Sequence, residues 1–415
     1  MDTGFDAGPD EHAPEASPLP TKQLALLALL SLCEQTALNS VSPYLPDMVR
    51  SFDEIPAGQT GLYVGVLASA FALAQLATNL LWGYLSDSIG RKPVLLLGTA
   101  LLTACFAVFG FCTTYWQAVV VHVAMGLLNG NAAIVPTCLG EVTDRTNQSR
   151  AFTWLPVVYS IGGITGPALG GLLVRAGAAY PYLGPNIASA ALLLVSVIVL
   201  AVWFDETLDV ADGRVAGLGP SWLAKWREGG RRTRRRSSRE DADAEGRALL
   251  TDDDDAAAGG PGESIFRRLL SRRTVLLLLT YLLFQLSNVG FNSLYPIFAS
   301  SPPTTGRGLT PEAIGLLLSS AGFVTIAFQV FLFGPLKART GNLGAYRAAL
   351  LGLAVGTTLM PWVGYAGEPP AGGKGRLYAE MAAVLAVKNI SAVGGLSSVL
   401  LLVGFSGRFQ LRRGR

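Results

Sequence analysis

The sequence has few charged residues and few of the residue types that usually carry enzyme chemistry. Of its 415 residues, 15% are charged and 2 are histidines, whereas about a quarter of the residues in a soluble domain are charged. We find no nucleophile with a nearby base and no nucleotide-binding loop, so the sequence predicts no enzyme and no cofactor. The cysteines lie in or beside apolar runs, without the spacing of metal ligands or of a disulfide framework: Cys33, Cys105, Cys112 and Cys138.

Long apolar runs dominate what is present. Hydrophobic residues make up 50% of the chain, and the mean hydropathy is +0.41. A helix needs about 20 predominantly apolar residues to cross a membrane. Runs of about this length occur at 22–42, 61–82, 93–111, 115–138, 152–174, 182–204, 274–298, 312–333, 345–365 and 377–403. The sequence therefore predicts an all-α, multi-pass membrane protein, and its net charge of +3 gives no reason to expect a nucleic-acid partner.

The distribution of basic residues indicates the orientation in the membrane. Lys and Arg are concentrated at 86–92, 141–150, 335–347 and the C-terminal tail, and such loops are retained in the cytoplasm. We therefore expect both termini in the cytoplasm, at the plasma membrane or the vacuolar membrane. Residues 1–21 lack the features of a signal peptide and are predicted to be a disordered cytoplasmic tail, and residues 404–415 a basic one.

One long polar segment divides the chain. Residues 205–273 contain a basic run and an acidic run and little that could form a core, which predicts a disordered cytoplasmic linker. The linker separates residues 22–204, with six expected spans, from residues 274–403, with four. Its basic run is either part of a solvated tether or a contact for anionic lipid headgroups.

The most specific motif lies between the second and third spans, where residues 83–92 read GYLSDSIGRK. So short a connection predicts an antiparallel helical pair, with glycines that allow the turn and a close approach, and with Asp87 facing a helix N-terminus. The segment resembles the G-x-x-x-D-x-x-G-R-K signature of the major facilitator superfamily of transporters. By this resemblance the expected conformational hinge consists of Gly83, Asp87, Gly90, Arg91 and Lys92.

The resemblance implies two six-helix bundles related as repeats. Residues 334–341 are a weak copy of the motif that keeps both glycines but has Ala338 in the place of Asp87. No apolar run follows Val403. We therefore expect the fold of the superfamily with a six-helix N-terminal bundle and an incomplete, four-helix C-terminal bundle, without the last two helices.

The fifth span carries a second motif of small residues, at Gly163, Gly166, Pro167, Gly170 and Gly171. A helix face without large side chains packs closely against a neighbour, and proline removes one backbone hydrogen bond. The stretch resembles the G-x-x-x-G-P-x-x-G-G motif of proton-coupled antiporters in the superfamily. The alternative is close packing without a mechanistic role.

Three ionisable residues lie within the apolar runs and away from their ends: Glu34, His122 and Lys388. Such groups are costly in a membrane unless they are paired or face a wet cavity. The resemblance places all three on helices that line the central cavity, although the family has arginine where this chain has His122. Glu34 is the expected proton carrier, and His122 could share the proton. The alternative is a structural ion pair of Glu34 with His122 or Lys388, and Lys388 could instead bind a substrate carboxylate.

Neutral amide side chains extend the same expected cavity surface: Gln35, Asn39, Asn129, Gln285, Asn288 and Asn292. The last three are spaced i, i+3 and i+7, which places them on one face of a helix. For any single amide, a hydrogen bond between helices is an equal alternative.

Short stretches at 42–48, 127–131 and 181–186 resemble fungal and plant antiporters of the zinc-induced facilitator-like and tetracycline-resistance-like groups. This implies proton-coupled efflux, as in multidrug resistance, of a small organic molecule or metal chelate by alternating access, with no metal site in the protein. The alternative is a truncated membrane protein without transport activity or a modulatory subunit of a full-length relative. The expected partners are the substrate, protons and the lipid bilayer, and the sequence does not indicate the oligomeric state.

Overall fold

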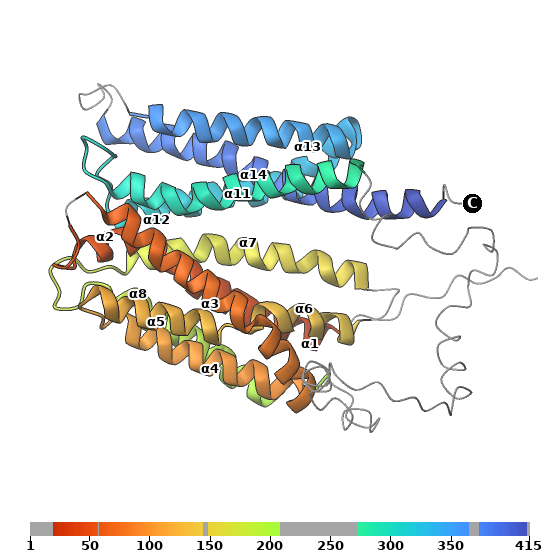
Figure 1. The fold of residues 1–415 in the computed structure, drawn as a ribbon, viewed down its shortest axis with the longest axis horizontal. Helices are drawn as coiled ribbons and strands as arrows, with labels where there is room; N and C mark the ends of the chain where they lie inside the picture. The colour runs from red at the N-terminus through yellow and green to blue at the C-terminus, as the bar shows by residue number, and fades with distance from the viewer. Residues whose placement is uncertain (1–19, 57, 144–147, 208–271, 365–372, 413–415) are drawn as a thin grey trace, which may run out of the picture. The chain divides into compact units, whose positions relative to one another are not determined.

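The computed structural model describes residues 20–56, 58–143, 148–207, 272–364 and 373–412, in which all the regular elements are helices (Figure 1). The predicted all-α class is confirmed. In the first part of the chain the helices are α1 (Thr21–Ser40), α2 (Leu45–Arg50), α3 (Thr60–Ile89), α4 (Arg91–Phe109), α5 (Tyr115–Leu128), α6 (Asn131–Val142), α7 (Gln148–Leu172) and α8 (Leu183–Trp203). In the second they are α11 (Arg272–Ser300), α12 (Pro311–Ala327), α13 (Phe333–Leu359) and α14 (Gly373–Arg412), with a π-helical turn at Phe328–Leu332.

Each predicted span corresponds to part of this helical structure. Within the described residues, 8 helical stretches are long and apolar enough to cross a membrane, and α7 contributes a shorter apolar stretch at Val157–Leu172. The predicted spans 312–333 and 345–365 fall in one continuous stretch, Pro311–Trp362, because the chain stays helical between them except at Gly341, where φ is 70°. Residues 1–19 of the predicted N-terminal tail and most of the predicted linker lie outside the described residues. Residues 404–412 of the predicted C-terminal tail instead continue helix α14.

The expectation of a loop at residues 86–92 is wrong. Helix α3 continues through Asp87 to Ile89, and α4 begins at Arg91. The only residue between the two helices is Gly90, whose φ of 110° is a conformation that L-residues rarely adopt. Gly83 lies inside α3, and a Cβ atom added there would meet no atom within 4 Å, so this glycine is not the site of a close helix contact.

The predicted fourth span is interrupted. Helix α5 ends at Leu128 and α6 starts at Asn131, because the backbone of Asn129, with a ψ of 75°, leaves the helical conformation. The indole ring of Trp82 on α3 fills this break: its Nε1 donates a hydrogen bond to the backbone carbonyl of Leu127 at 2.7 Å. A Cβ atom on Gly130 would overlap the same ring. The break is therefore a packed feature of the helix.

The described residues within 1–209 and 285–396 form one compact unit, and the site described below lies within it. In its first part α1 packs against α7 and α8, α4 against α8, and α3 against α5. One apolar core surrounds the fully buried Tyr44, Met48 and Phe106, and another surrounds Leu30 and Phe204. Within the part after residue 285, a separate core includes Tyr295, Ile314 and Met381.

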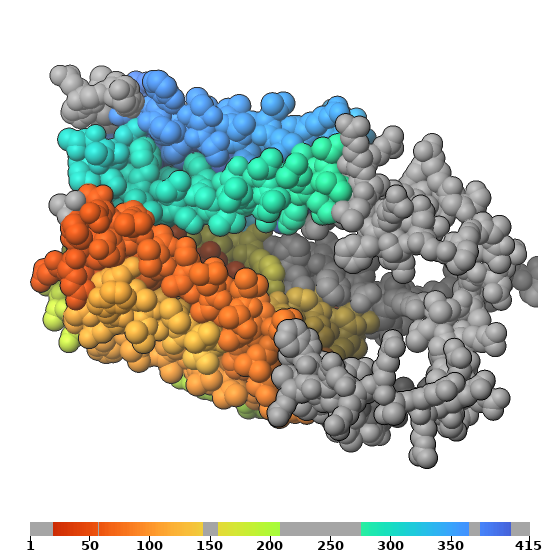
Figure 2. All heavy atoms as spheres, in the orientation of Figure 1, coloured from red at the N-terminus to blue at the C-terminus, as the bar shows by residue number. Residues whose placement is uncertain are grey.

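Apolar side chains also remain exposed. Helix α3 runs across the face seen in Figure 2, and on this helix Leu73, Leu76 and Leu80 are 66%, 69% and 88% exposed. Their spacing places them on one side of the helix. A large exposed apolar stripe is unfavourable in water but suits contact with lipid tails.

The connections between the helices gather at two ends of the unit (Figure 1). One end carries α2, the α7–α8 connection and the α11–α12 connection, and we name it the α2 end. The other carries Gly90, the end of α6 and the residues after α8, and we name it the Arg91 end.

Candidate functional site

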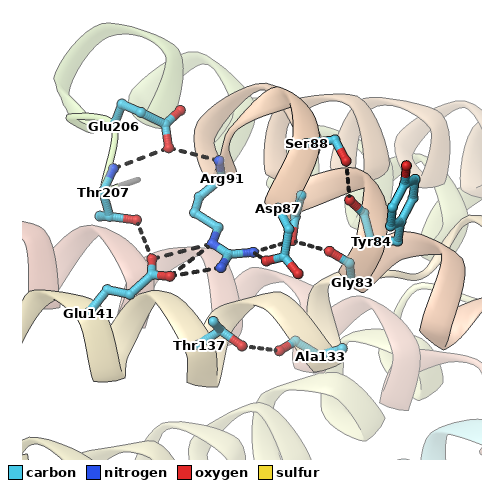
Figure 3. Close-up of polar contacts among 11 residues, drawn as sticks. Gly83, Tyr84, Asp87, Ser88, Arg91, Ala133, Thr137, Glu141, Glu206 and Thr207 are labelled. Carbon is cyan, nitrogen blue, oxygen red and sulfur yellow. Dashed lines mark hydrogen bonds and ion pairs between the residues drawn. The ribbon is translucent and has the colours of Figure 1, made fainter. Parts of the chain in front are cut away.

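The motif residue Arg91 lies at the centre of a polar cluster at the Arg91 end (Figure 3). Its guanidinium donates to Glu141 Oε1 through Nη2 at 2.8 Å and through Nε at 3.1 Å. Its Nη1 contacts Asp87 Oδ1 and Ser86 Oγ, both at 2.5 Å. The side chain of Arg91 is 7% exposed, whereas that of Asp87 is 63% exposed. Glu141 is therefore the better shielded partner of the buried guanidinium.

The N-terminus of α4 faces a different carboxylate from the one expected. The two oxygens of Glu206 accept hydrogen bonds from the backbone amides of Arg91 at 2.7 Å and of Lys92 at 3.1 Å. An anion is favourable here because the first amides of a helix have no partners within the helix. The expectation that Asp87 faces a helix N-terminus is wrong, since Asp87 pairs with Arg91 instead.

Thr207 closes the cluster. Its hydroxyl group donates a hydrogen bond to Glu141 Oε2 at 2.9 Å, so residues after α8, on α6 and at the start of α4 are linked (Figure 3). A Cβ atom on Gly90 would lie 2.8 Å from Glu206 Oε2. The backbone conformation at position 90 therefore favours glycine, and a side chain there would also displace the Glu206 carboxylate.

A second polar site surrounds Glu34 in the middle of α1. Glu34 is 3% exposed, and its carboxyl group lies beside the amide group of Asn131, the first residue of α6. Asn131 also donates a hydrogen bond to Thr99 Oγ1 on α4 at 2.9 Å. Tyr159 on α7 lies within electrostatic reach of the same carboxyl group. Glu34 thus faces the helix break of the fourth span through Asn131.

The neighbouring face of α1 packs against the glycine motif of α7. The hydroxyl oxygens of Thr36 and Thr165 are 2.7 Å apart. Cβ atoms added to Gly166 and Gly170 would overlap α1, at Asn39 and at the carbonyl oxygen of Ser40. Gln35 lies on this interface too, against Gly162, whereas Gly163 has open space around its Cα.

The other face of α7 packs against α12 towards the α2 end. A Cβ atom on Gly171 would overlap the carbonyl oxygen of Pro311, and one on Gly315 would overlap that of Pro167. Nearer the middle, Ser319 Oγ donates a hydrogen bond to the carbonyl oxygen of Ile164 at 2.6 Å. The glycines therefore place α7 in close contact with two helices from different parts of the chain.

A cavity of about 330 Å³ lies among α1, α3, α5 and α11. Its wall is mostly apolar, with Phe71, Phe106 and Met125 among the lining residues. His122 also lines it, between the rings of Phe71 and Phe109, each with a centroid 5.4 Å from that of the imidazole. The side chain is 9% exposed, and its Nδ1 has no hydrogen-bond partner among the described residues.

Asn292 lines the cavity from α11 and connects it to Lys388. The ammonium group of Lys388, 1% exposed, donates hydrogen bonds to the side-chain oxygen of Asn292 and to that of Asn389, the latter at 3.3 Å. It also lies 5.1 Å from the centroid of the Phe291 ring. Its polar neighbours are thus neutral.

The structure therefore distributes the predicted residues over several places. Among the described residues, Glu34 forms no ion pair with His122 or Lys388, so the structural ion pair considered above is absent. Of the remaining amides, Gln285 is half-buried on α11, whereas Asn288 and Asn129 each hold a buried oxygen without a partner in the described part of the chain.

Sequence reasoning missed Glu141, Glu206 and Thr207. Glu206 and Thr207 stand in the segment taken as a linker, and Glu141 at the start of a presumed loop. One available signal was a carboxylate directly after an apolar run, at the membrane end where Arg91 was expected.

Comparison with known proteins identifies the family. The model of the Major Facilitator Superfamily matches residues 27–409. The chain belongs to this superfamily. A relative is the Major facilitator superfamily multidrug transporter mfsB of Aspergillus fumigatus, 29% identical over 394 residues, with 81% of this chain and 65% of the relative covered. Protein ZINC INDUCED FACILITATOR-LIKE 1 of Arabidopsis thaliana is 24% identical over 76% of this chain and 63% of its own length. The chain thus spans about two thirds of these relatives.

Solved structures share the fold. The D-xylose-proton symporter superposes with a TM-score of 0.60 over 94% of this chain and 88% of its own, at 12% identity. The human organic anion transporter MFSD10 gives a TM-score of 0.52 over 94% and 91%, at 18% identity. The predicted resemblance is confirmed. Superfamily members are membrane transporters, which agrees with the prediction of a multi-pass membrane protein that is not an enzyme.

Proposed function

We propose that the protein exports a small organic molecule or metal chelate in exchange for protons, with Glu34 as the proton carrier. The observation that carries the proposal is the isolation of Glu34: it is 3% exposed, in the middle of a membrane helix, with neutral polar neighbours. A buried carboxylate without a cation is unfavourable when ionised. Its protonation therefore depends on whether water reaches it, which is what a carrier in an alternating-access cycle requires.

The helix break next to Glu34 supports this role. Asn131 is both the first residue of α6 and the neighbour of the Glu34 carboxyl group. The start of a helix favours negative charge, and broken membrane helices commonly form ion and substrate sites. The start of α6 thus partly stabilises the negative charge of ionised Glu34, and this stabilisation can change when α5 and α6 move.

The glycine interfaces of α7 support alternating access. α7 contacts α1 on one face and α12 on the other through positions where no side chain fits. Such contacts allow one part of a transporter to rock against another with little reorganisation of side chains. Relatives described as a multidrug transporter and as the class H tetracycline resistance protein of Pasteurella multocida favour efflux of organic molecules.

The distribution of basic residues favours a cytoplasmic location for the Arg91 end. Arg91 and Lys92 stand there, and Arg339 and Arg347 flank the corresponding turn at Gly341. By the positive-inside rule this end stays in the cytoplasm, and the α2 end faces the opposite side. The proposed transport direction is from the Arg91 end to the α2 end.

Transport by everted membrane vesicles tests the proposal. We expect the wild type to accumulate tetracycline or 2-naphthoate in vesicles with an acidic interior. Glu34→Gln should abolish this accumulation but retain part of the exchange of labelled for unlabelled probe, because a carboxamide resembles the protonated acid but releases no proton. The matched control is Glu312→Gln, an exposed glutamate in the first turn of α12.

Two results would contradict the proposal. Proton-driven accumulation at the wild-type rate in Glu34→Gln would exclude Glu34 as the carrier. Failure of the wild type to accumulate either probe, with the protein correctly inserted, would contradict organic-molecule efflux by this chain.

A further inference from the structure

Lys388 is a buried cation without an anion. Within the described residues it forms no ion pair, and its hydrogen-bond acceptors are the neutral amides of Asn292 and Asn389. A buried charge is costly unless an opposite charge accompanies it. The ring of Phe291 offsets only part of that cost. A negatively charged group placed next to the Lys388 ammonium group would therefore be strongly favourable.

The ammonium group lies one side chain behind the wall of the cavity. Asn292 both accepts the hydrogen bond of Lys388 and lines the cavity. Helix α13 approaches the backbone of Lys388 closely at Gly356, where an added Cβ would lie 3.0 Å from the Cβ of Lys388. Rotation of the Asn292 side chain away from Lys388 would therefore open the ammonium group of Lys388 to the cavity.

The rest of the cavity suits the apolar body of an organic molecule. Phe71, Phe106 and Met125 give it aromatic and thioether surface. The one titratable side chain among the lining residues, His122, is nine-tenths buried and has an Nδ1 without a partner among the described residues. A ligand that fills the cavity would thus meet apolar surface, one imidazole nitrogen and, behind Asn292, one cation.

We infer that this cavity binds amphipathic organic anions: the apolar body occupies the space beside His122, and a carboxylate replaces Asn292 as the acceptor for Lys388. The inference deepens the proposed function, on which it rests, by naming the substrate class. A charge-assisted hydrogen bond to a carboxylate is stronger than one to a neutral amide. The exchange of Asn292 for the carboxylate would compensate the buried charge.

Equilibrium binding to the purified full chain tests the inference with two probes of the same shape, 2-naphthoate and its neutral analogue 2-naphthamide. We expect the wild type to bind 2-naphthoate at least about tenfold more tightly. Lys388→Met should abolish this preference, whereas Lys388→Arg should retain it. The matched control is Lys374→Met, because Lys374 is an exposed lysine on the same helix.

His122→Phe separates the two parts of the site. It keeps an aromatic ring in the wall but removes the nitrogen, so it should weaken both probes by a similar factor and leave the preference for the anion intact. An effect of His122→Phe on 2-naphthoate alone would contradict the proposed arrangement.

Other results would overturn the inference. These are equal affinities of the wild type for both probes, no binding of either, or a preference that survives in Lys388→Met. The last result would favour a role for Lys388 in proton transfer. Monodisperse elution of each variant from size-exclusion chromatography verifies folding, and Lys388→Arg still tests the inference should the methionine variant misfold. The assay uses no proton gradient, so its outcome is independent of the vesicle test of Glu34.

Discussion

The carboxylate of Glu206 accepts a hydrogen bond from the backbone amide of Arg91 at 2.7 Å, although the two residues are 115 positions apart in the sequence. The same side chain accepts from the amide of Lys92. A residue that follows the last helix of the first part of the chain thus caps the helix that follows the signature motif. Several consequences can be measured.

Glu206→Ala should lower the free energy of unfolding in detergent by about 1 kcal/mol, because the first amides of α4 lose their acceptor. Hydrogen–deuterium exchange should accelerate at Arg91 and Lys92. Asp205→Ala is the control, since the side chain of Asp205 is 74% exposed and is paired with Lys22 and Gln23 rather than with the amides of α4. Equal effects of the two substitutions on exchange in α4 would contradict the capping role.

Glu141→Gln should destabilise the protein more than Asp87→Asn. Glu141 accepts three hydrogen bonds from a guanidinium group that is 7% exposed, whereas Asp87 is 63% exposed. We expect a loss of about 2 kcal/mol or more for the first and less than about 1 kcal/mol for the second. Thermal unfolding in detergent measures both. A larger loss for Asp87→Asn would mean that the motif carboxylate is the main partner of Arg91.

Gly170→Ala should destabilise the contact between α1 and α7. A Cβ atom at position 170 would lie 1.8 Å from the backbone oxygen of Ser40, which cannot move without shifting α1. The expected loss is about 1–3 kcal/mol. Gly163→Ala, in the same helix and the same motif, meets no atom within 4 Å and should be neutral or stabilising by up to about 1 kcal/mol. Similar unfolding temperatures for the two variants would show that the interface is looser than described.

Hydropathy could predict the helices because a membrane imposes a length and a composition on each span. The glycines of the motif at residues 83–92 could also predict a turn there, and the turn lies at Gly90, where a positive φ favours glycine. The corresponding position in the weak copy of the motif, Gly341, has a φ of 70° and shows the same device. These features depend on local sequence.

Contacts between segments that are distant in the sequence were harder to predict. Nothing local marks Glu206 as the cap of α4. The helix break at Asn129 and Gly130 did have a local signal, because an Asn-Gly pair is typical of a turn, but the apolar run around it favoured one continuous span. The neutral surroundings of Lys388 depend on how α11 and α14 pack and could not be predicted from spacing.

The cluster around Arg91 also sets an order of assembly during synthesis. A chain leaves the ribosome from its N-terminus, so Arg91 and Glu141 emerge and can pair while α8 is still untranslated. Glu206 and Thr207 are synthesised only after α8, and their hydrogen bonds to Arg91 and Glu141 then join the residues after α8 to α4 and α6 at the Arg91 end. The residues from 285 onwards are therefore synthesised after these bonds can form. A chain released from a ribosome that stalls before residue 206 would lack the hydrogen bonds of Glu206 and Thr207.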